Sequence, residues 1–428
     1  MRKTLTRVAH SVRPIFPQWF VNYVYHLPLA VLASYLYGNP GKDLEVIGVT
    51  GTDGKTTTTS LIYHILKVAK KKVAMVSTVE ARVGRKQIKT GFHVTSPNPF
   101  ALQKLLRRMR SQKIRYVVLE TTSQGLDQFR IYPIRPRVAV LTNITHEHLD
   151  YHKSFEAYRD AKLKLFKHAE HAVVNKDLPI FDDINIRLPK VLFSTYSIKN
   201  DSQLKPSAIR YSEKSTTFTI GSTTYEVPLT GEYNVYNCLA SVATALILDI
   251  SPSDIKRALS TFPGVPGRLE PIENKRGIHA IVDFAHTPNA LEMVLANLAS
   301  QKRKGESLIA VFGSAGLRDA TKRPLMGAAA AKYADQIVIT TEDPRTESAA
   351  DIAAAITSGI PKEKKKIVHV ELDREKAIDY AINTLAQKGD WVVACGKGHE
   401  ESMNYDGETE MPWSDQAAME KALEKQGQ

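Results

Sequence analysis

The sequence predicts an α/β fold with two parallel-sheet domains, preceded by a short helical segment. Apolar runs of strand length alternate with helical stretches, first between residues 46 and 174 and again between residues 280 and 394. A stretch dense in glycine and proline (FPGVPG, 262–267) separates the two series. Because alternating strands and helices favour parallel sheets, we expect an N-terminal segment at 1–43, a central domain at 44–266 and a C-terminal α/β domain at 267–428.

The N-terminal segment contains an apolar and aromatic run at residues 17–37. Gln18, Asn22, His26 and Pro28 interrupt this run, so we do not expect a membrane-spanning helix. A pair of short amphipathic helices is the expected structure, and an interfacial helix in peripheral contact with a membrane stays open as the alternative. The segment is about as short as the chains that rarely form a stable domain alone.

The expected elements of the two domains follow from apolar periodicity. Central strands are expected at residues 46–49, 73–76, 116–119, 138–141 and 172–174, with helices at 60–68, 99–110 and 155–166. Threonine-rich alternation around Gly221 predicts a β-hairpin within 209–227, and a helix follows at 234–248. C-terminal strands are expected at 280–284, 308–312, 336–340, 367–370 and 391–394.

Composition limits the class of partner. The 428 residues carry a net charge of +13, but the basic residues are scattered or form short runs. Because no aromatic residues interleave with them, we expect no nucleic-acid partner; a phosphorylated, carboxylate-rich small molecule suits a basic protein. Cys238 and Cys395 lie in apolar surroundings and are interpreted as buried thiols of a reducing compartment. With no signal-peptide pattern in view, we expect a cytoplasmic protein, and a monomer.

A phosphate-binding loop is predicted directly after the first central strand. Glycines let the backbone close around phosphate oxygens, and the N-terminus of the next helix adds partial positive charge. Lys55 is expected to reach the β- and γ-phosphates and the Thr56 hydroxyl to bind Mg²⁺. Val49 stands where the strict pattern has its first glycine, but the strand–turn–helix context favours a P-loop-type ATPase domain. The loop residues are Gly51, Thr52, Asp53, Gly54, Lys55, Thr56 and Thr57.

Candidate metal ligands follow later strands of the same domain. Glu120 ends an apolar strand, and ligands gather at the carboxyl ends of strands in such sheets. The stretch TNITHEHLDYH (142–152) supplies several histidines and acids after the next strand. Zinc is one interpretation, but cysteine ligands are missing there and the phosphate loop is near, so Mg²⁺ is favoured.

These motifs together resemble the Mur ligase family. The loop TGTDGKTT is similar to that family's TGTNGKTT, with Asp53 in place of asparagine, and NITHEHLD is similar to its N-x-x-x-D-H-L-D, with Glu147 in place of aspartate. The resemblance implies that Glu120 and His148 hold Mg²⁺ with the phosphates. It also implies that Lys162 is the lysine that the family carbamylates, which turns a cation into an acidic oxygen ligand.

Three further motifs resemble the family's ATP site. GEYNVYN is similar to G-x-[HF]-N-x-x-N, PGRLE to PGR[ML]E and VDFAHTP to VDYAHTP. By that resemblance Asn237 contacts adenine, Arg268 meets the γ-phosphate when the domains close, and Asp283 lies at the ribose. The implied catalytic residues are therefore Lys55, Lys162 and Arg268.

Within the family, the C-terminal motifs resemble those of ligases that add meso-diaminopimelate. EDPR (342–345) aligns with DNPR, and GKGHE (396–400) matches the family motif of the same letters. The resemblance implies a Rossmann-like domain in which Arg345 grips the distal carboxylate of the amino acid as a bidentate partner. Gly396 and Glu400 would bind its far amino group. Glu342 and Asp343 replace the usual Asp and Asn, so L-lysine stays open as the added amino acid.

The second substrate implied by the resemblance is a UDP-muramyl-peptide. TSP and TSQGLDQFR are similar to the family's TTP and SSHGLxQxR, which implies contacts from Thr95, Ser96, Thr122, Gln128 and Arg130. The implied reaction is ATP-dependent addition of a diamino acid to UDP-MurNAc-L-Ala-D-Glu through an acyl phosphate, in peptidoglycan precursor synthesis. The family's N-terminal UDP-binding domain finds no match in residues 1–43, so a lipid-linked muramyl-peptide or a poly-amino-acid is an alternative acceptor. A non-catalytic ATP-binding scaffold is the alternative from another class.

Overall fold

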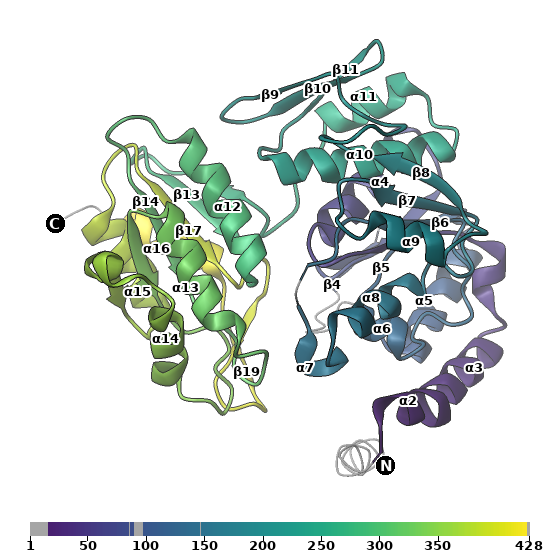
Figure 1. Ribbon diagram of the computed structural model, residues 1–428, viewed down its shortest axis with the longest axis horizontal. Helices are drawn as coiled ribbons and strands as arrows, with labels where there is room; N and C mark the ends of the chain where they lie inside the picture. Colours follow the sequence, from purple (N-terminus) through teal and green to yellow (C-terminus); the bar gives the residue numbers. More distant parts are fainter. Residues whose placement is uncertain (1–15, 85, 90–96, 146, 426–428) are drawn as a thin grey trace.

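A computed structural model of the chain describes residues 16–84, 86–89, 97–145 and 147–425. The described chain forms two lobes that lie side by side (Figure 1). One lobe carries the N-terminal helices and an eight-stranded sheet, and the other carries a six-stranded sheet. The two series of strands expected from the sequence therefore form separate sheets.

The larger lobe is built on the eight-stranded sheet. Its strands are Glu45–Thr50 (β1), Val73–Val76 (β2), Glu80–Val83 (β3), Lys86–Lys89 (β4), Tyr116–Glu120 (β5), Val138–Leu141 (β6), His171–Asn175 (β7) and Leu192–Tyr196 (β8). They lie in the order β4-β3-β2-β5-β1-β6-β7-β8. β1 lies between β5 and β6 and is parallel to both, whereas β3 and β4 extend one edge as antiparallel strands. The loops after β1, β5 and β6 consequently meet at one edge of the sheet.

Helices cover both faces of this sheet, which explains why the strands are continuously apolar. The helices of the lobe are Lys55–Val68 (α4), Pro99–Ser111 (α5), Ser123–Asp127 (α6), Leu149–His152 (α7), Phe155–Leu163 (α8), Phe181–Arg187 (α9), Glu232–Ile247 (α10) and Pro252–Ser260 (α11). α4, α10 and α11 form a core with one face. α5, α6 and α8 form a core with the other.

The expected hairpin is present and gains a third strand. Thr216–Ile220 (β10) pairs antiparallel with Thr223–Val227 (β11), and Ala208–Tyr211 (β9) pairs with the other edge of β10. β9 was not expected as a separate strand: most of its side chains are exposed, so the sequence carries little apolar alternation there.

The second lobe contains a mostly parallel six-stranded sheet. Its strands are Glu270–Ile272 (β12), His279–Asp283 (β13), Leu308–Phe312 (β14), Gln336–Ile339 (β15), Val368–Val370 (β16) and Trp391–Cys395 (β17), in the order β12-β13-β17-β14-β15-β16. Only β12 joins its neighbour antiparallel among these pairs of described strands. A small hairpin of Ser402–Asn404 (β18) and Glu410–Pro412 (β19) follows.

Helices cover both faces of this sheet as well. They are Pro288–Gln301 (α12), Lys322–Tyr333 (α13), Ala349–Ser358 (α14), Arg374–Tyr380 (α15) and Asp415–Glu424 (α16), with a 3₁₀ turn at Lys362–Ile367 (η3) and a π turn at Ala381–Leu385 (η4). α12, α13 and α14 pack on one face, and α15 and α16 on the other.

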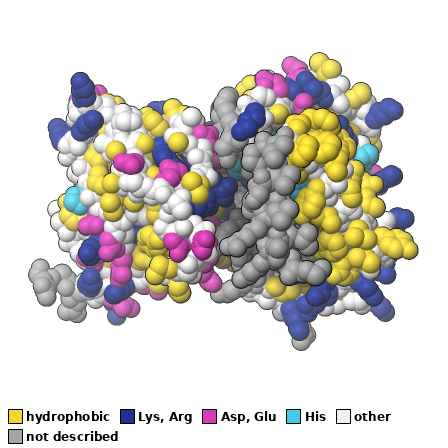
Figure 2. All heavy atoms as spheres, turned by 90° about the horizontal axis from the view of Figure 1, so that it is seen from below, with side chains coloured by type: hydrophobic (Ala, Val, Ile, Leu, Met, Phe, Trp, Pro, Cys, Tyr) yellow, Lys and Arg dark blue, Asp and Glu magenta, His cyan; other side chains and the backbone are white. Residues whose placement is uncertain are grey.

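The N-terminal segment differs from the expected pair of helices. Gln18–Val21 (α2) and Leu27–Leu36 (α3) are joined by a π-helical turn at Asn22–His26 (η1) into one helical run. Pro28 explains the wider turn, because its ring lacks an N–H and would clash with the carbonyl four residues earlier in a regular α-helix. A 3₁₀ turn at Pro40–Asp43 (η2) then leads into β1. Seen from below, the lobe that carries these helices shows a broad apolar surface (Figure 2).

Most predicted strands are confirmed to within one or two residues, whereas two helix boundaries were wrong. The helix expected at 155–166 ends at Leu163 and continues as a turn. α4 starts at Lys55 rather than at residue 60. Its first turns read KTTTTS and lack the apolar periodicity on which the prediction depended. Among the residues that the structure describes, no helix has the length and apolar character needed to cross a membrane.

Candidate active site

The phosphate loop lies between β1 and α4, as expected. Gly54 has a φ of 78°, and a Cβ built there would lie 2.3 Å from Asn237 Oδ1, so only glycine fits. The side chain of Asn143, at the end of β6, accepts hydrogen bonds from the N–H groups of Thr52 and Asp53 at 3.0 and 2.8 Å. Lys55 Nζ donates to the Thr52 carbonyl at 2.7 Å. The loop is therefore held by neighbouring strand ends, with its lysine folded over it.

Glu120 lies beside this loop at the end of β5. Its buried carboxylate accepts hydrogen bonds from Thr56 Oγ1 at 3.1 Å and from the N–H and hydroxyl of Thr78 at 2.9 and 2.8 Å. The structure thus brings together two of the predicted Mg²⁺ ligands, the Thr56 hydroxyl and the Glu120 carboxylate. Thr78 follows β2 and was not singled out from the sequence.

Lys162 was expected at the site only through the family resemblance. On its own pattern it resembles an exposed helix lysine, yet it is 1% exposed. Its Nζ donates to the Gly51 carbonyl at 2.6 Å and lies 4.3 Å from the ring centroid of Tyr158. Burial lowers the pKa of Lys162 well below its ordinary 10.5, and the positive charge of Lys55 lowers it further. A lowered pKa favours the neutral amine, which is the form that can react with CO₂ to give a carbamate.

His148 is the remaining predicted metal ligand. Its backbone has a φ of 58°, and burial together with Lys162 and Lys55 holds its pKa well below 6.5. A neutral imidazole can donate a lone pair to a metal. Within the described residues, no three His, Cys, Asp or Glu side chains group as metal ligands. Glu120 and His148 therefore do not make a metal site by themselves, and the predicted ligand set also includes Thr56 and Lys162.

The second lobe reaches across to the phosphate loop. Arg268 donates to Thr56 Oγ1 at 3.4 Å, and its guanidinium carbon lies 4.5 Å from the ring centroid of Phe284. Asn289, near the start of α12, donates to Asp53 Oδ2 at 2.8 Å. Asn289 was missed in the sequence, because its partner Asp53 lies 236 positions away along the chain. The contact also explains how the extra carboxylate of Asp53 is accommodated.

The predicted adenine and ribose residues lie at the same junction. Asn237 on α10 donates to Asn234 Oδ1 at 3.1 Å and accepts from Thr58 Oγ1 at 3.2 Å, so the asparagines share one helix face as expected. Asp283 ends β13 and accepts from the N–H groups of Leu269 and Ala285, both at 2.7 Å. Burial raises the pKa of this carboxyl, against the lowering effect of Arg268.

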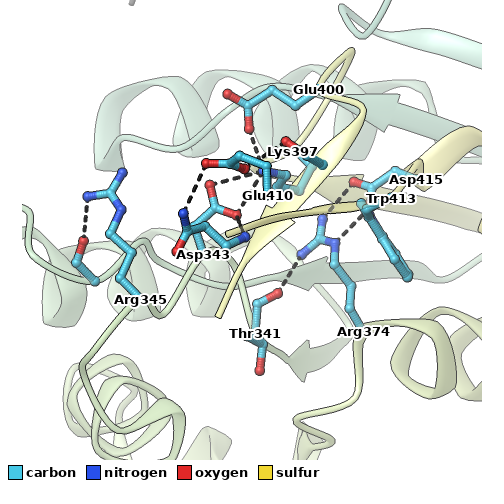
Figure 3. A network of polar contacts seen from close by, with 12 residues as sticks. Thr341, Asp343, Arg345, Arg374, Lys397, Glu400, Glu410, Trp413 and Asp415 are labelled. Atoms are coloured by element: carbon cyan, nitrogen blue, oxygen red, sulfur yellow. Dashed lines mark hydrogen bonds and ion pairs between the residues drawn. The ribbon is translucent and has the colours of Figure 1, made fainter. Parts of the chain in front are cut away.

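The predicted amino-acid residues form a polar network at the carboxyl edge of the second sheet (Figure 3). Lys397 is fully buried and lies between Asp343, at 3.0 Å from both carboxylate oxygens, and Glu400, at 2.5 Å. Arg345 donates to the Gly316 carbonyl at 2.9 Å. Below them, Arg374 forms a fully buried ion pair with Asp415. Arg374 also donates to the carbonyls of Thr341 and Cys395 and so links the strand ends beneath the network.

Glu342 stands out beside this network. It is buried, and its Oε2 has no hydrogen-bond partner. Burial raises its pKa to about 7, although Lys322 and Arg374 oppose the shift. A Cβ at Gly396, whose φ is 110°, would lie 2.2 Å from this oxygen. Glycine at 396 is therefore what admits the longer acid in place of the family's aspartate.

The expected acceptor residues are only partly described. Thr122 caps α6 by accepting from the Gly125 N–H at 3.0 Å. Gln128 Oε1 accepts from Arg130 Nε and Nη2 at 3.1 and 2.7 Å. Gln128 thus orients Arg130, and Arg130 faces the cavity described next. Thr95 and Ser96 lie outside the described residues.

One cavity of about 850 Å³ connects these groups. Its walls include Lys55 and Glu120 from the first lobe and Arg345 and Glu400 from the second, with Arg268 between them. Lys162 lies behind the phosphate loop. A phosphate loop, a strand-end carboxylate and an arginine from a second lobe define an enzyme that uses a nucleoside triphosphate and works by bringing two lobes together.

Comparison with known proteins gives the family. Residues 49–245 match the Mur ligase middle domain, and residues 267–398 match the Mur ligase glutamate ligase domain. A relative from Syntrophomonas wolfei subsp. wolfei, named UDP-N-acetylmuramoyl-L-alanyl-D-glutamate--2,6-diaminopimelate ligase, is 39% identical over 381 residues, covering 87% of this chain and 77% of its own length. The chain therefore belongs to the Mur ligase family, whose members are ATP-dependent amide ligases that form ADP.

Solved structures agree on the architecture. A structure with the same ligase name has a TM-score of 0.63 at 30% identity, covering 91% of this chain and 81% of its own. A folylpolyglutamate synthase from Mycobacterium tuberculosis has a TM-score of 0.69 at 17% identity, covering 94% of this chain and 96% of its own. At that identity the second likeness shows the fold alone.

Proposed function

We propose that this Mur ligase joins meso-diaminopimelate to UDP-MurNAc-L-Ala-D-Glu through an acyl phosphate, with ATP and Mg²⁺. The observation that carries the proposal is the single cavity that runs from Lys55 and Glu120 to Arg345. Phosphate activation and amine capture can therefore occur in one connected cavity. The substrates are those in the names of the relatives above.

In the first step, a carboxylate oxygen of the acceptor attacks the γ-phosphorus of ATP, and ADP leaves. Lys55 belongs to the phosphate loop, and Arg268 reaches the loop from the second lobe. Both would offset the negative charge on the transferring phosphoryl group. Thr56, Glu120, His148 and carbamylated Lys162 would hold Mg²⁺, which supplies further neutralisation of phosphate charge. The hydroxyl and carboxylate oxygens suit such an ion, and the lowered pKa of His148 leaves an imidazole lone pair that could be added to them.

In the second step, the amine attacks the acyl carbon and inorganic phosphate leaves, so that an amide forms. Arg345 would bind the distal carboxylate of meso-diaminopimelate with two parallel hydrogen bonds. Glu400 would accept from its ammonium group, with Lys397 holding the carboxylate in place.

L-Lysine is the second candidate amine. One observation favours it: Asp343, two positions before Arg345, lines the cavity with a carboxyl group where the resembled motif has an amide. A carboxylate at this position would suit a terminal ammonium better than a second carboxylate.

The experiment is ATP-dependent phosphate release with UDP-MurNAc-L-Ala-D-Glu, with meso-diaminopimelate and L-lysine tested side by side. We expect turnover with meso-diaminopimelate, and we expect Arg345→Ala to remove most of the preference over L-lysine. Arg257→Ala, an exposed arginine on α11, is the matched control. Turnover with L-lysine alone would overturn the choice of amine. No phosphate release with either amine, in protein that binds ATP, would overturn the choice of acceptor and favour a lipid-linked muramyl-peptide or a poly-amino-acid.

A further inference from the structure

The N-terminal helical run exposes its large apolar side chains and buries its small ones. Asn22, Ala30, Ala33 and Ser34 face the protein and are buried. The opposite face is exposed, with Tyr35 at 82% and its other large members Phe16, Trp19, Tyr23, Val24, Tyr25, Val31, Leu32 and Leu36. A helix at a water-covered surface has the reverse arrangement. An apolar face of this extent indicates a surface that something else covers.

Specific contacts hold the helix in this orientation. Asn22 Nδ2 donates to Asp127 Oδ2 at 2.6 Å, and the ring of Tyr23 meets that of Phe129 edge-on at 5.2 Å. α3 packs along α5. Turning the apolar face inward would break the Asn22–Asp127 hydrogen bond and place large side chains where Ala30 and Ala33 now fit.

Basic side chains lie beside this face on the neighbouring helix α5. α5, beside α3, reads PFALQKLLRRMRS, with four basic residues and no acid. Lys104, Arg107 and Arg110 on it are exposed. Along the sequence, residues 1–42 contain no Asp or Glu, whereas residues 1–13 include Arg2, Lys3, Arg7 and Arg13. The first acid, Asp43, already pairs with Arg110.

We propose that the helical run of residues 18–36 lies on an anionic lipid bilayer, with its aromatic face among the acyl chains and headgroups. Aromatic and aliphatic side chains on one face, beside lysine and arginine without acids, suit a helix that lies in the plane of such an interface. The face packed on Asp127 and α5 stays with the protein, so the helix rests on the membrane and does not cross it. Apolar surface and charge both favour an anionic lipid surface over a neutral protein partner. Docking would turn the segment that holds Gln128 and Arg130 toward the membrane, since the helix contacts Asp127 and Phe129.

The test is co-sedimentation of the full chain with vesicles of phosphatidylglycerol and phosphatidylethanolamine, against vesicles of phosphatidylcholine alone. We expect binding to the anionic vesicles that weakens as salt is added. The double variant Trp19→Ser/Tyr35→Ser should lower the partition coefficient by about tenfold or more, because it removes two exposed aromatic anchors. Lys104→Gln/Arg107→Gln should lower binding to anionic vesicles only. Ile186→Ser removes an equally exposed apolar side chain, 76% exposed on α9, and should change nothing.

Circular dichroism and ATP binding of each variant show that the fold is retained. The proposal is overturned if wild type does not sediment with anionic vesicles, or if Trp19→Ser/Tyr35→Ser sediments as wild type does. A third outcome also overturns it: light scattering shows a wild-type dimer that Trp19→Ser/Tyr35→Ser dissociates, and neither wild type nor this variant binds vesicles. The apolar face would then join two copies of the chain. Ligase activity does not enter these readouts, so the result stands apart from the proposed reaction.

Discussion

Replacing Glu342 with glutamine should remove a pH-dependent loss of stability. Glu342 is buried beside the amino-acid end of the cavity, and burial raises its pKa from 4.5 to about 7. A carboxyl whose pKa is higher in the folded state binds its proton more tightly there than in the unfolded chain. Its contribution to stability is therefore complete below about pH 4.5 and is lost as the pH rises through about 7. At about 1.4 kcal/mol per unit of pKa, the loss is about 3 kcal/mol.

The assay is urea unfolding of wild type and Glu342→Gln between about pH 5 and pH 8, followed by tryptophan fluorescence. Trp391 and Trp413 pack in the second lobe, whereas Trp19 is already exposed in the folded chain. The change in signal on unfolding therefore reports mainly on the domain that contains Glu342. We expect the unfolding free energy of the variant to exceed that of wild type by a margin that widens by about 2 to 3 kcal/mol over this range. Glu420→Gln, an exposed acid on α16, should show no widening. A margin that stays constant with pH would refute the raised pKa of Glu342.

Three further predictions concern the phosphate loop. Lys162→Ala should reduce turnover by about 100-fold or more while ATP binding persists, because the amine is needed as a carbamate. For the same reason, wild type should slow in CO₂-free buffer and recover with bicarbonate. Lys167→Ala, at an exposed lysine, is the control. Asp53→Asn should tighten ATP binding several-fold in calorimetry, because it removes a negative charge while the amide oxygen can still accept from Asn289; unchanged or weaker binding would contradict this. Arg268→Ala should lower kcat by about 100-fold or more with a smaller change in the Kd for ATP, because the guanidinium acts on charge that develops during phosphoryl transfer. Equal effects on kcat and Kd would show instead that Arg268 serves ground-state binding of ATP.

Most strands follow from local pattern, because buried parallel strands are continuous apolar runs. The phosphate loop was also predictable, because Gly54 and Lys55 are adjacent in sequence and the turn that holds them lies directly between a strand and a helix. Glu120 could be placed because it ends a strand that neighbours β1. In each case the relevant contacts are local or follow directly from strand adjacency.

Contacts between distant residues could not be predicted in this way. The burial of Lys162 depends on the Gly51 carbonyl, 111 positions away, and the pairing of Asn289 with Asp53 depends on how the lobes meet. Neither leaves a periodic signal in the sequence. The orientation of the N-terminal helical run, with its large apolar side chains exposed, could not be predicted either. A run with apolar residues on most sides does not reveal which side will face the protein.

The central claim, that ATP activates the carboxylate of the acceptor, is tested most directly by oxygen transfer. UDP-MurNAc-L-Ala-D-Glu would be prepared with ¹⁸O in the side-chain carboxylate of its glutamate and turned over with ATP and the accepted amine, and the released phosphate would be analysed by mass spectrometry. An acyl phosphate that breaks at the acyl carbon leaves one carboxylate oxygen on phosphate, so the account predicts one ¹⁸O atom in each phosphate formed. Unlabelled phosphate, with amide product formed, would contradict it.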